Sequence, residues 1–197
     1  MTVRVNKDSF NLREKLSELD YGHVPYDKMP AGSVIRTEYK QFDTRLQINH
    51  SGSLAFYDFS DLNITISPFS LSSKFLMQAN VVSSEDTNPN GGPAFRYEYG
   101  GNIYYGNGDY SYTTGMQSKS FAEVDDLNIV SKNSSAPHMT KTYHGAALVK
   151  PNTTDTITFK LGFHGLATFN VNRNNNTATG ANYGSGFTTL TVMEIAG

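Results

Sequence analysis

The residues of this 197-residue chain that could carry out chemistry are few and scattered. It has no cysteine, which excludes thiol nucleophiles, thiolate metal sites and disulfides. No nucleophile elbow, phosphate-binding loop or dinucleotide fingerprint occurs. The five histidines show no metal-binding spacing; they are His23, His50, His138, His144 and His164. His144 and His164 could meet across neighbouring strands, but we expect them to face solvent instead. We therefore expect a non-enzymatic protein without catalytic residues, metal or cofactor.

Paired carboxylates are the remaining enzymatic candidate, because glycoside hydrolysis needs two of them. The pairs closest in sequence or in the expected hairpins are Asp58 with Asp61, Asp125 with Asp126, and Glu98 with Asp109. All are consistent with ordinary turn and edge residues, and only geometry can decide. Residues 86–91 match the first half of a calcium loop, but Tyr97 stands where the loop requires a bidentate glutamate. We expect no metal there.

One stretch, YEYGGNIYYGNGDYSYTTG at 97–115, stands out for its tyrosines: Tyr97, Tyr99, Tyr104, Tyr105, Tyr110 and Tyr112. Tyr97 and Tyr99 alternate, Gly100 and Gly101 make a turn, and the chain returns at Tyr104, which predicts a β-ribbon. Tyrosine suits such ribbons because its ring packs while its hydroxyl stays hydrated. Tyrosines in Gly/Asn-rich loops also form recognition surfaces. The stretch is therefore either structural with a subunit contact, or a ligand-binding surface for sugars.

The composition favours an all-β protein of ordinary charge. Only 17% of the residues are charged, and Asn, Ser, Thr, Gly and Tyr, which form turns and strands, fill the difference. The net charge of −2, with no basic run, gives no basis for binding nucleic acid. No apolar run approaches signal-peptide or membrane-spanning length, so we expect synthesis in the cytosol and no membrane insertion.

Residues 32–197 show the period-two alternation of half-buried antiparallel strands. The clearest cases are Leu62, Ile64 and Ile66; Phe75, Met77, Ala79 and Val81; Ile157, Phe159, Leu161 and Phe163; and Phe169 with Val171. Further strands are expected at 34–42, 45–49, 54–59, 96–99, 127–130, 142–149 and 187–195, with turns at 88–93, 107–109, 132–137, 150–155 and 172–180. Eight to eleven short strands predict one antiparallel β-sandwich domain, jelly-roll-like.

The final strand is expected to be buried on both faces. Leu190 and Val192 share one face, and Met193 and Ile195 share the other. Such a strand lies in the middle of a sandwich or at a subunit interface.

Residues 1–31 form a separate N-terminal arm in this interpretation. Asn11 and Glu14 are spaced as a capping box, and a short helix then carries one apolar stripe formed by Leu12, Leu16 and Leu19, with Tyr21 just beyond. A helix of about two turns is not stable alone, so these residues must dock. The stripe packs either on its own domain or on a partner subunit, for which the arm would be the anchor.

Three segments resemble a known family. MPAGSVIRTEYKQF (29–42), ITISPFSLSSKFLMQANV (64–81) and TTLTVMEIAG (188–197) are similar to the first strand, a strand–turn–strand segment and the closing strand of small β-rich virion proteins of marine tailed phages, especially cyanophages. The leader NLREKLSELDYG also resembles theirs. The likeness covers about a third of the chain and leaves out the tyrosine stretch.

The resemblance implies a non-enzymatic virion protein, homotrimeric and jelly-roll-like, assembled in the host cytoplasm. It implies other virion proteins as partners, such as the major capsid protein or a neighbouring structural subunit. A head decoration or cement protein is the leading hypothesis, since the chain has one sandwich and no repeat array or sustained heptad pattern that would form a shaft. The alternative is a short fibre or adhesin head whose tyrosines bind host-surface glycans.

Overall fold

The computed structural model describes residues 29–48, 55–85, 91–106, 141–165, 169–172 and 186–197. The expected arm helix with Leu12, Leu16, Leu19 and Tyr21 lies outside these residues, as do Tyr110, Tyr112, the calcium-loop-like segment from 86 to 90 and the strand expected at 127–130. Those expectations therefore stay predictions.

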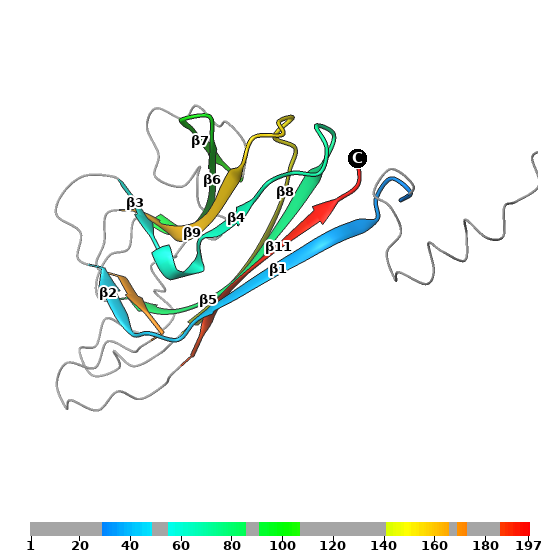
Figure 1. The fold of residues 1–197 in the computed structure, drawn as a ribbon. Helices are drawn as coiled ribbons and strands as arrows, with labels where there is room; N and C mark the ends of the chain where they lie inside the picture. The colour runs from blue at the N-terminus through cyan, green and yellow to red at the C-terminus, as the bar shows by residue number, and fades with distance from the viewer. Residues whose placement is uncertain (1–28, 49–54, 86–90, 107–140, 166–168, 173–185) are drawn as a thin grey trace, which may run out of the picture.

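The described chain folds into two antiparallel sheets (Figure 1). Sheet A contains β1 (Val34–Phe42), β2 (Leu46–Ile48), β5 (Lys74–Glu85), β8 (Lys141–Val149), β10 (Phe169–Val171) and β11 (Thr188–Ile195). In this sheet β5 is central: β8 pairs with one of its edges, and β11 and β10 pair in turn with the other. Beyond these, β1 pairs with β11 and β2 pairs with β10.

Sheet B contains β3 (Ala55–Asp58), β4 (Ile64–Ile66), β6 (Gly91–Tyr99), β7 (Asn102–Tyr105) and β9 (Ile157–Gly165). Here β9 is central, with β3 and β4 on one edge and β6 on the other, and β7 follows β6. A short 3-10 turn, η2 (Ser60–Leu62), joins β3 to β4.

The strand pairs are nested around the turn at Gly100 and Gly101. From this turn outwards the pairs are β6 with β7, β5 with β8, β3 and β4 with β9, and β1 and β2 with β11 and β10. Successive pairs alternate between the two sheets, as in a long antiparallel ribbon rolled into a sandwich, which is the jelly-roll arrangement. The all-β, jelly-roll-like prediction is confirmed, and the tyrosine hairpin is the innermost turn of the roll.

The apolar alternation seen in the sequence forms the core between the sheets. Phe75, Met77, Leu190 and Val192 face inward from sheet A, and Ile157, Phe159, Leu161 and Phe163 face inward from sheet B; all are fully buried. The rings of Phe75 and Phe159 meet across the sandwich at a centroid distance of 4.9 Å.

Two strand expectations need correction. The turn expected at 88–93 ends earlier, because β6 already begins at Gly91 and Pro93 pairs with Phe163 of β9. Among the described residues, β7 pairs only with positions 96–99 of β6. At Pro93 the edge of β6 that faces away from β9 therefore has no paired strand among these residues, and the N–H group that proline lacks is not needed for a strand hydrogen bond. The last strand does not lie in the middle of the sandwich: Leu190 and Val192 lie in the core, whereas Met193 and Ile195 are half-buried on the outside of sheet A. Burial of this second face at a subunit interface stays a prediction.

One end of the sandwich gathers three loops and the C-terminus (Figure 1). The hydroxyl of Ser67, after β4, lies 2.9 Å from that of Thr156, before β9. The Gly32 amide donates to the Ala196 carbonyl, so the chain enters β1 beside the point where it leaves β11. The described chain therefore begins at this end of the sandwich.

Candidate functional site

The hairpin formed by β6 and β7 divides the described tyrosines between two faces. Tyr97 and Tyr104 are cross-strand partners, and with Tyr99 they lie on the inner side of sheet B, where Tyr97 also packs against Phe159. The three rings stack on one another, with centroid distances of 4.7 Å, 5.2 Å and 6.3 Å. Because these rings stack on each other, the three tyrosines form a packed, half-buried cluster at the sheet margin.

Tyr99 ties this cluster to the neighbouring loop. Its hydroxyl donates to the Pro151 carbonyl at 3.0 Å, in the connection between β8 and β9. A hydrogen bond with Tyr104, assisted by burial, raises the pKa of Tyr99 to about 12. The hydroxyl therefore stays protonated and serves as a structural donor from sheet B to the loop that connects β8 with β9.

Tyr105 points to the opposite, outer face of sheet B. Its ring forms edge-to-face pairs with the rings of Phe56 and His164, at centroid distances of 6.2 Å and 5.9 Å. Burial raises the pKa of the Tyr105 phenol. His164 is itself buried, which corrects the expectation that it faces solvent, whereas His144 is exposed as expected. The two histidines lie in different sheets, so they do not meet.

Alternating charges continue across this outer face. Arg96 pairs with Glu98, which also lies 3.1 Å from the Lys160 ammonium, and Lys160 in turn lies 3.2 Å from Asp58. The Arg96 guanidinium stands 5.1 Å above the ring of Phe56. The outer face of sheet B is thus a network of two cations and two carboxylates beside aromatic rings.

Asp58 and Glu98 are the two carboxylates that this network brings together, although the sequence suggested other pairs. Burial lowers the pKa of the Lys160 ammonium, but hydrogen bonds to Glu98 and Asp58 outweigh this effect and leave that pKa raised. Lys160 therefore stays charged, and together with Arg96 it balances the charges of the two carboxylates. The arrangement is therefore that of a structural ion-pair network and differs from a general acid facing a general base.

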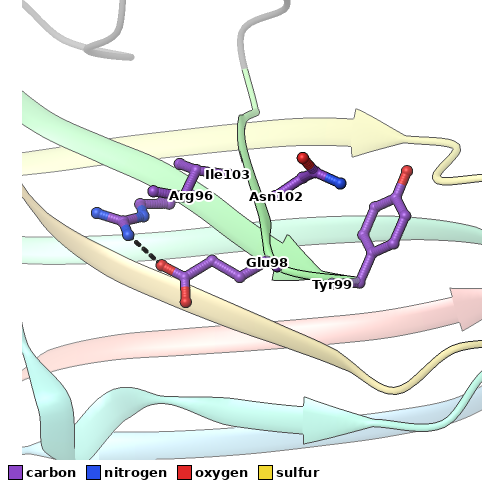
Figure 2. A pocket seen from close by; sticks show the side chains of 6 residues that line it. Arg96, Glu98, Tyr99, Asn102 and Ile103 are labelled. Atoms are coloured by element: carbon purple, nitrogen blue, oxygen red, sulfur yellow. Dashed lines mark ion pairs between the residues drawn. The ribbon is translucent and has the colours of Figure 1, made fainter.

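A hollow of about 370 Å³ borders the hairpin, lined by Arg96, Glu98, Tyr99, Gly101, Asn102 and Ile103 (Figure 2). Figure 2 shows the ion pair of Arg96 and Glu98 at one side of the hollow and Tyr99 at the other. These side chains offer hydrogen-bond donors and acceptors of the kind that bind sugar hydroxyls.

The outer face of sheet A is quite different, because it is almost uncharged. Its outward side chains, from β1, β11, β5 and β8, are Val34, Thr37, Tyr39 and Gln41; Thr189, Thr191, Met193 and Ile195; Lys74, Leu76, Gln78, Asn80 and Val82; and Thr142, His144, Ala146 and Leu148. Lys74 carries the only formal charge in this set. Tyr39 and Leu148 are 56% and 61% exposed, at opposite margins of the face.

The buried carboxylate of Glu194 holds the loop from β4 to β5, which lies at the end of the sandwich and carries exposed apolar residues. Glu194 is fully buried and accepts hydrogen bonds from Arg36, from the Phe69 amide and from the Ser73 hydroxyl. This fixes the connection from β4 to β5, on which Phe69 and Leu71 are exposed. The sequence interpretation missed Glu194, although its place two residues after Val192 put a carboxylate on the core face and therefore called for buried partners.

Within the described residues no group of three or more His, Asp or Glu side chains is placed to hold a metal ion. No helix of this described part has the length and hydropathy needed to cross a bilayer.

No family model matches the chain, and no curated protein matches it. Among solved structures, the chain is similar to the infectious bursal disease virus VP2 subviral particle protein, with a TM-score of 0.33 and 10% sequence identity. The similarity covers 84% of this chain but only 38% of the VP2 chain, so the chain spans well under half of that protein's length.

Proposed function

We propose that this chain is a non-enzymatic structural protein of a tailed bacteriophage virion, and specifically a head decoration or cement protein. The observation that carries the proposal is the outer face of sheet A, which is four strands wide, almost uncharged and rich in half-exposed apolar side chains. Contiguous faces of this kind mark contact surfaces with other proteins. The likeness of 29–42, 64–81 and 188–197 to phage virion proteins supports the same conclusion.

The partner of this face would be the major capsid protein or a neighbouring structural subunit, met during assembly in the host cytoplasm. The arm, with its stripe of Leu12, Leu16 and Leu19, joins the domain beside Gly32 and Ala196 and would provide a second anchor. A homotrimer is the expected oligomer, and light scattering of the purified protein tests it.

The test measures incorporation into particles. Gln78 is exposed at the middle of the outer face of sheet A, so Gln78→Glu places a charge in the contact without disturbing the core. An unpaired charge costing at least 1.4 kcal/mol would lower occupancy by about tenfold or more at limiting protein. Thr65→Glu, at an exposed position of β4 on sheet B, is the matched control and should incorporate normally.

Equal incorporation of both variants would contradict the use of this face. Deleting residues 1–30 tests the arm separately: the truncated protein should fold but fail to join particles. Cryo-EM of purified particles should then place the chain at regular lattice positions on the head, and a location at a fibre tip would contradict the decoration role.

The alternative, an adhesin head, is favoured by one observation, the hollow beside Tyr99 and Asn102. In that case purified protein should bind host cells, and Asn102→Ala with Glu98→Gln should abolish binding. Unchanged binding by this double variant would contradict a glycan site in the hollow.

A further inference from the structure

Within the part of the chain that the structure describes, one edge of β8 has no strand partner, and it lacks the protection that the other sheet edges have. Exposed strand edges pair readily with other strands, so proteins protect them by short length, charges, bulges or proline. At the opposite edge of sheet A, β1 carries Arg36, Glu38 and Lys40 and a register irregularity between Val34 and Arg36. In sheet B, the edge strands β7, β3 and β4 have only four, four and three residues.

In contrast, β8 is nine residues long and has neither proline nor, from Thr142 to Val149, any formally charged side chain. Among the described residues it pairs with β5 alone, in uninterrupted register. Its outward side chains, at 142, 144, 146 and 148, are all exposed. The edge is therefore long, regular and uncharged.

The hydrogen bonds of Val82 show which groups of β8 face this edge. The Val82 amide donates to the Thr188 hydroxyl, and the Val82 carbonyl accepts from the Asn172 amide, so both backbone groups point away from β8. Peptide groups alternate in direction along a strand, and Thr142 is the partner of Val82. Hence Thr142 and every second residue after it, His144, Ala146 and Leu148, direct their N–H and C=O groups to the free edge.

We propose that two copies of this chain associate through β8, antiparallel about a two-fold axis, so that sheet A continues from one copy into the other. A two-fold pair centred on Gly145 is the register that satisfies all four edge-facing residues. It places Thr142 opposite Leu148 of the second copy and His144 opposite Ala146. The absence of a side chain at Gly145 lets the strands approach closely at the axis. An uncharged edge suits self-pairing, since a two-fold axis would bring any charge near the middle of the edge close to its own copy.

The first experiment measures the mass of the purified full chain by light scattering. The proposal expects an even number of 21.7 kDa chains: two if β8 makes the only contact, and six if the homotrimer proposed above also forms. Ala146→Lys adds a charge at the edge, as natural edge strands do, and should halve the mass. Gln78→Lys is the matched control, because Gln78 is the cross-strand neighbour of Ala146 on the same face but one strand away from the edge. It should keep the wild-type mass.

A monomeric wild type, or an oligomer that Ala146→Lys leaves intact, would overturn the proposal. Dissociation by both variants would also overturn it, because it would show that the face of sheet A makes the contact. The mass is measured without particles, so this result is independent of the virion role.

A second experiment tests the register and uses the absence of native cysteine. Residues opposite each other in a hydrogen-bonded antiparallel pair have Cα atoms about 5.5 Å apart, which is within disulfide range. A mixture of His144→Cys and Ala146→Cys chains should therefore cross-link on oxidation. A mixture of Thr142→Cys and Ala146→Cys chains should not, and equal cross-linking in both mixtures would exclude this register.

Discussion

Arg36 of β1 and Glu194 of β11 form an ion pair of 2.5 Å in which the carboxylate is fully buried and the guanidinium is 27% exposed. The same carboxylate accepts hydrogen bonds of 2.7 Å from the Phe69 amide and the Ser73 hydroxyl. Arg36 also donates to the Ser67 carbonyl and stands over the Phe69 ring. The buried carboxylate of Glu194 and its partner Arg36 therefore hold both ends of the β4–β5 loop against the end of sheet A.

Arg36→Met is expected to destabilise the protein by about 3–5 kcal/mol, because removing one partner leaves a buried carboxylate without its cation. Glu194→Gln should cost less, since the amide oxygen can still accept from Phe69 and Ser73 and the partly exposed Arg36 can turn to water. Urea unfolding measures both. Lys40→Met, at an exposed position of the same strand, is the control and should change stability by less than about 0.5 kcal/mol. Equal, small effects of Arg36→Met and Lys40→Met would show that the pair contributes nothing.

The strands themselves could be predicted because their alternation is a local property. The expected strand at 34–42 matches β1, and the inward residues of β5 and β9 are those whose spacing predicted them. The pairing could not be predicted in this way, since it depends on which distant strand meets which edge. That is why Gly91 was assigned to a turn and His164 to solvent, and why Tyr105 was grouped with tyrosines that lie on the other face of its sheet.

Alkaline pH should destabilise the protein partly through Tyr99. Its folded-state pKa is about 12 against 10.0 for an ordinary tyrosine. The unfolded chain therefore loses this proton first, and the stabilisation is fully present below pH 10 and is lost as the pH rises towards 12. Stability measured by urea unfolding should fall over this window less steeply in Tyr99→Phe than in the wild type.

Spectroscopic titration of the phenols gives an independent reading of the same group. Tyr99→Phe should remove a late-ionising component from the wild-type curve. Tyr39→Phe, which removes the hydroxyl of an exposed phenol from β1, should leave that component in place. A late component of unchanged size in Tyr99→Phe would assign it to another tyrosine and contradict the hydrogen-bonded position of Tyr99.

Asn172 should be among the most sensitive polar positions. It is fully buried at φ +55°, and its side-chain amide donates to the carbonyls of Phe42 and Thr44 and accepts from the Thr188 hydroxyl. Asn172→Ala leaves these groups unsatisfied and should cost about 2–4 kcal/mol in urea unfolding. Asn172→Asp keeps the acceptor for Thr188 but removes both donors, so it should be no more stable than the alanine variant. A fully stable aspartate variant would show that the donors to Phe42 and Thr44 are dispensable.

Gly162 should not tolerate a side chain, because the Tyr57 carbonyl of the neighbouring strand β3 occupies the space that a Cβ would need. A Cβ there would overlap the Tyr57 carbonyl and approach the Phe56 ring to 2.6 Å, and backbone cannot move aside as a flexible side chain can. Gly162→Ala should therefore push β3 away from β9 and destabilise the protein by about 1–3 kcal/mol.

Hydrogen exchange should show the loss of protection in the amides of β3 and at Phe59, whose N–H donates to the Leu161 carbonyl. Thr158→Ala, four residues earlier on the same face of β9, creates no overlap and should leave the exchange of β3 unchanged. If Gly162→Ala is as stable as the wild type, β3 must be free to shift. The contacts that β3 makes with Lys160, through Asp58, and with Tyr105, through Phe56, would then be looser than the structure indicates.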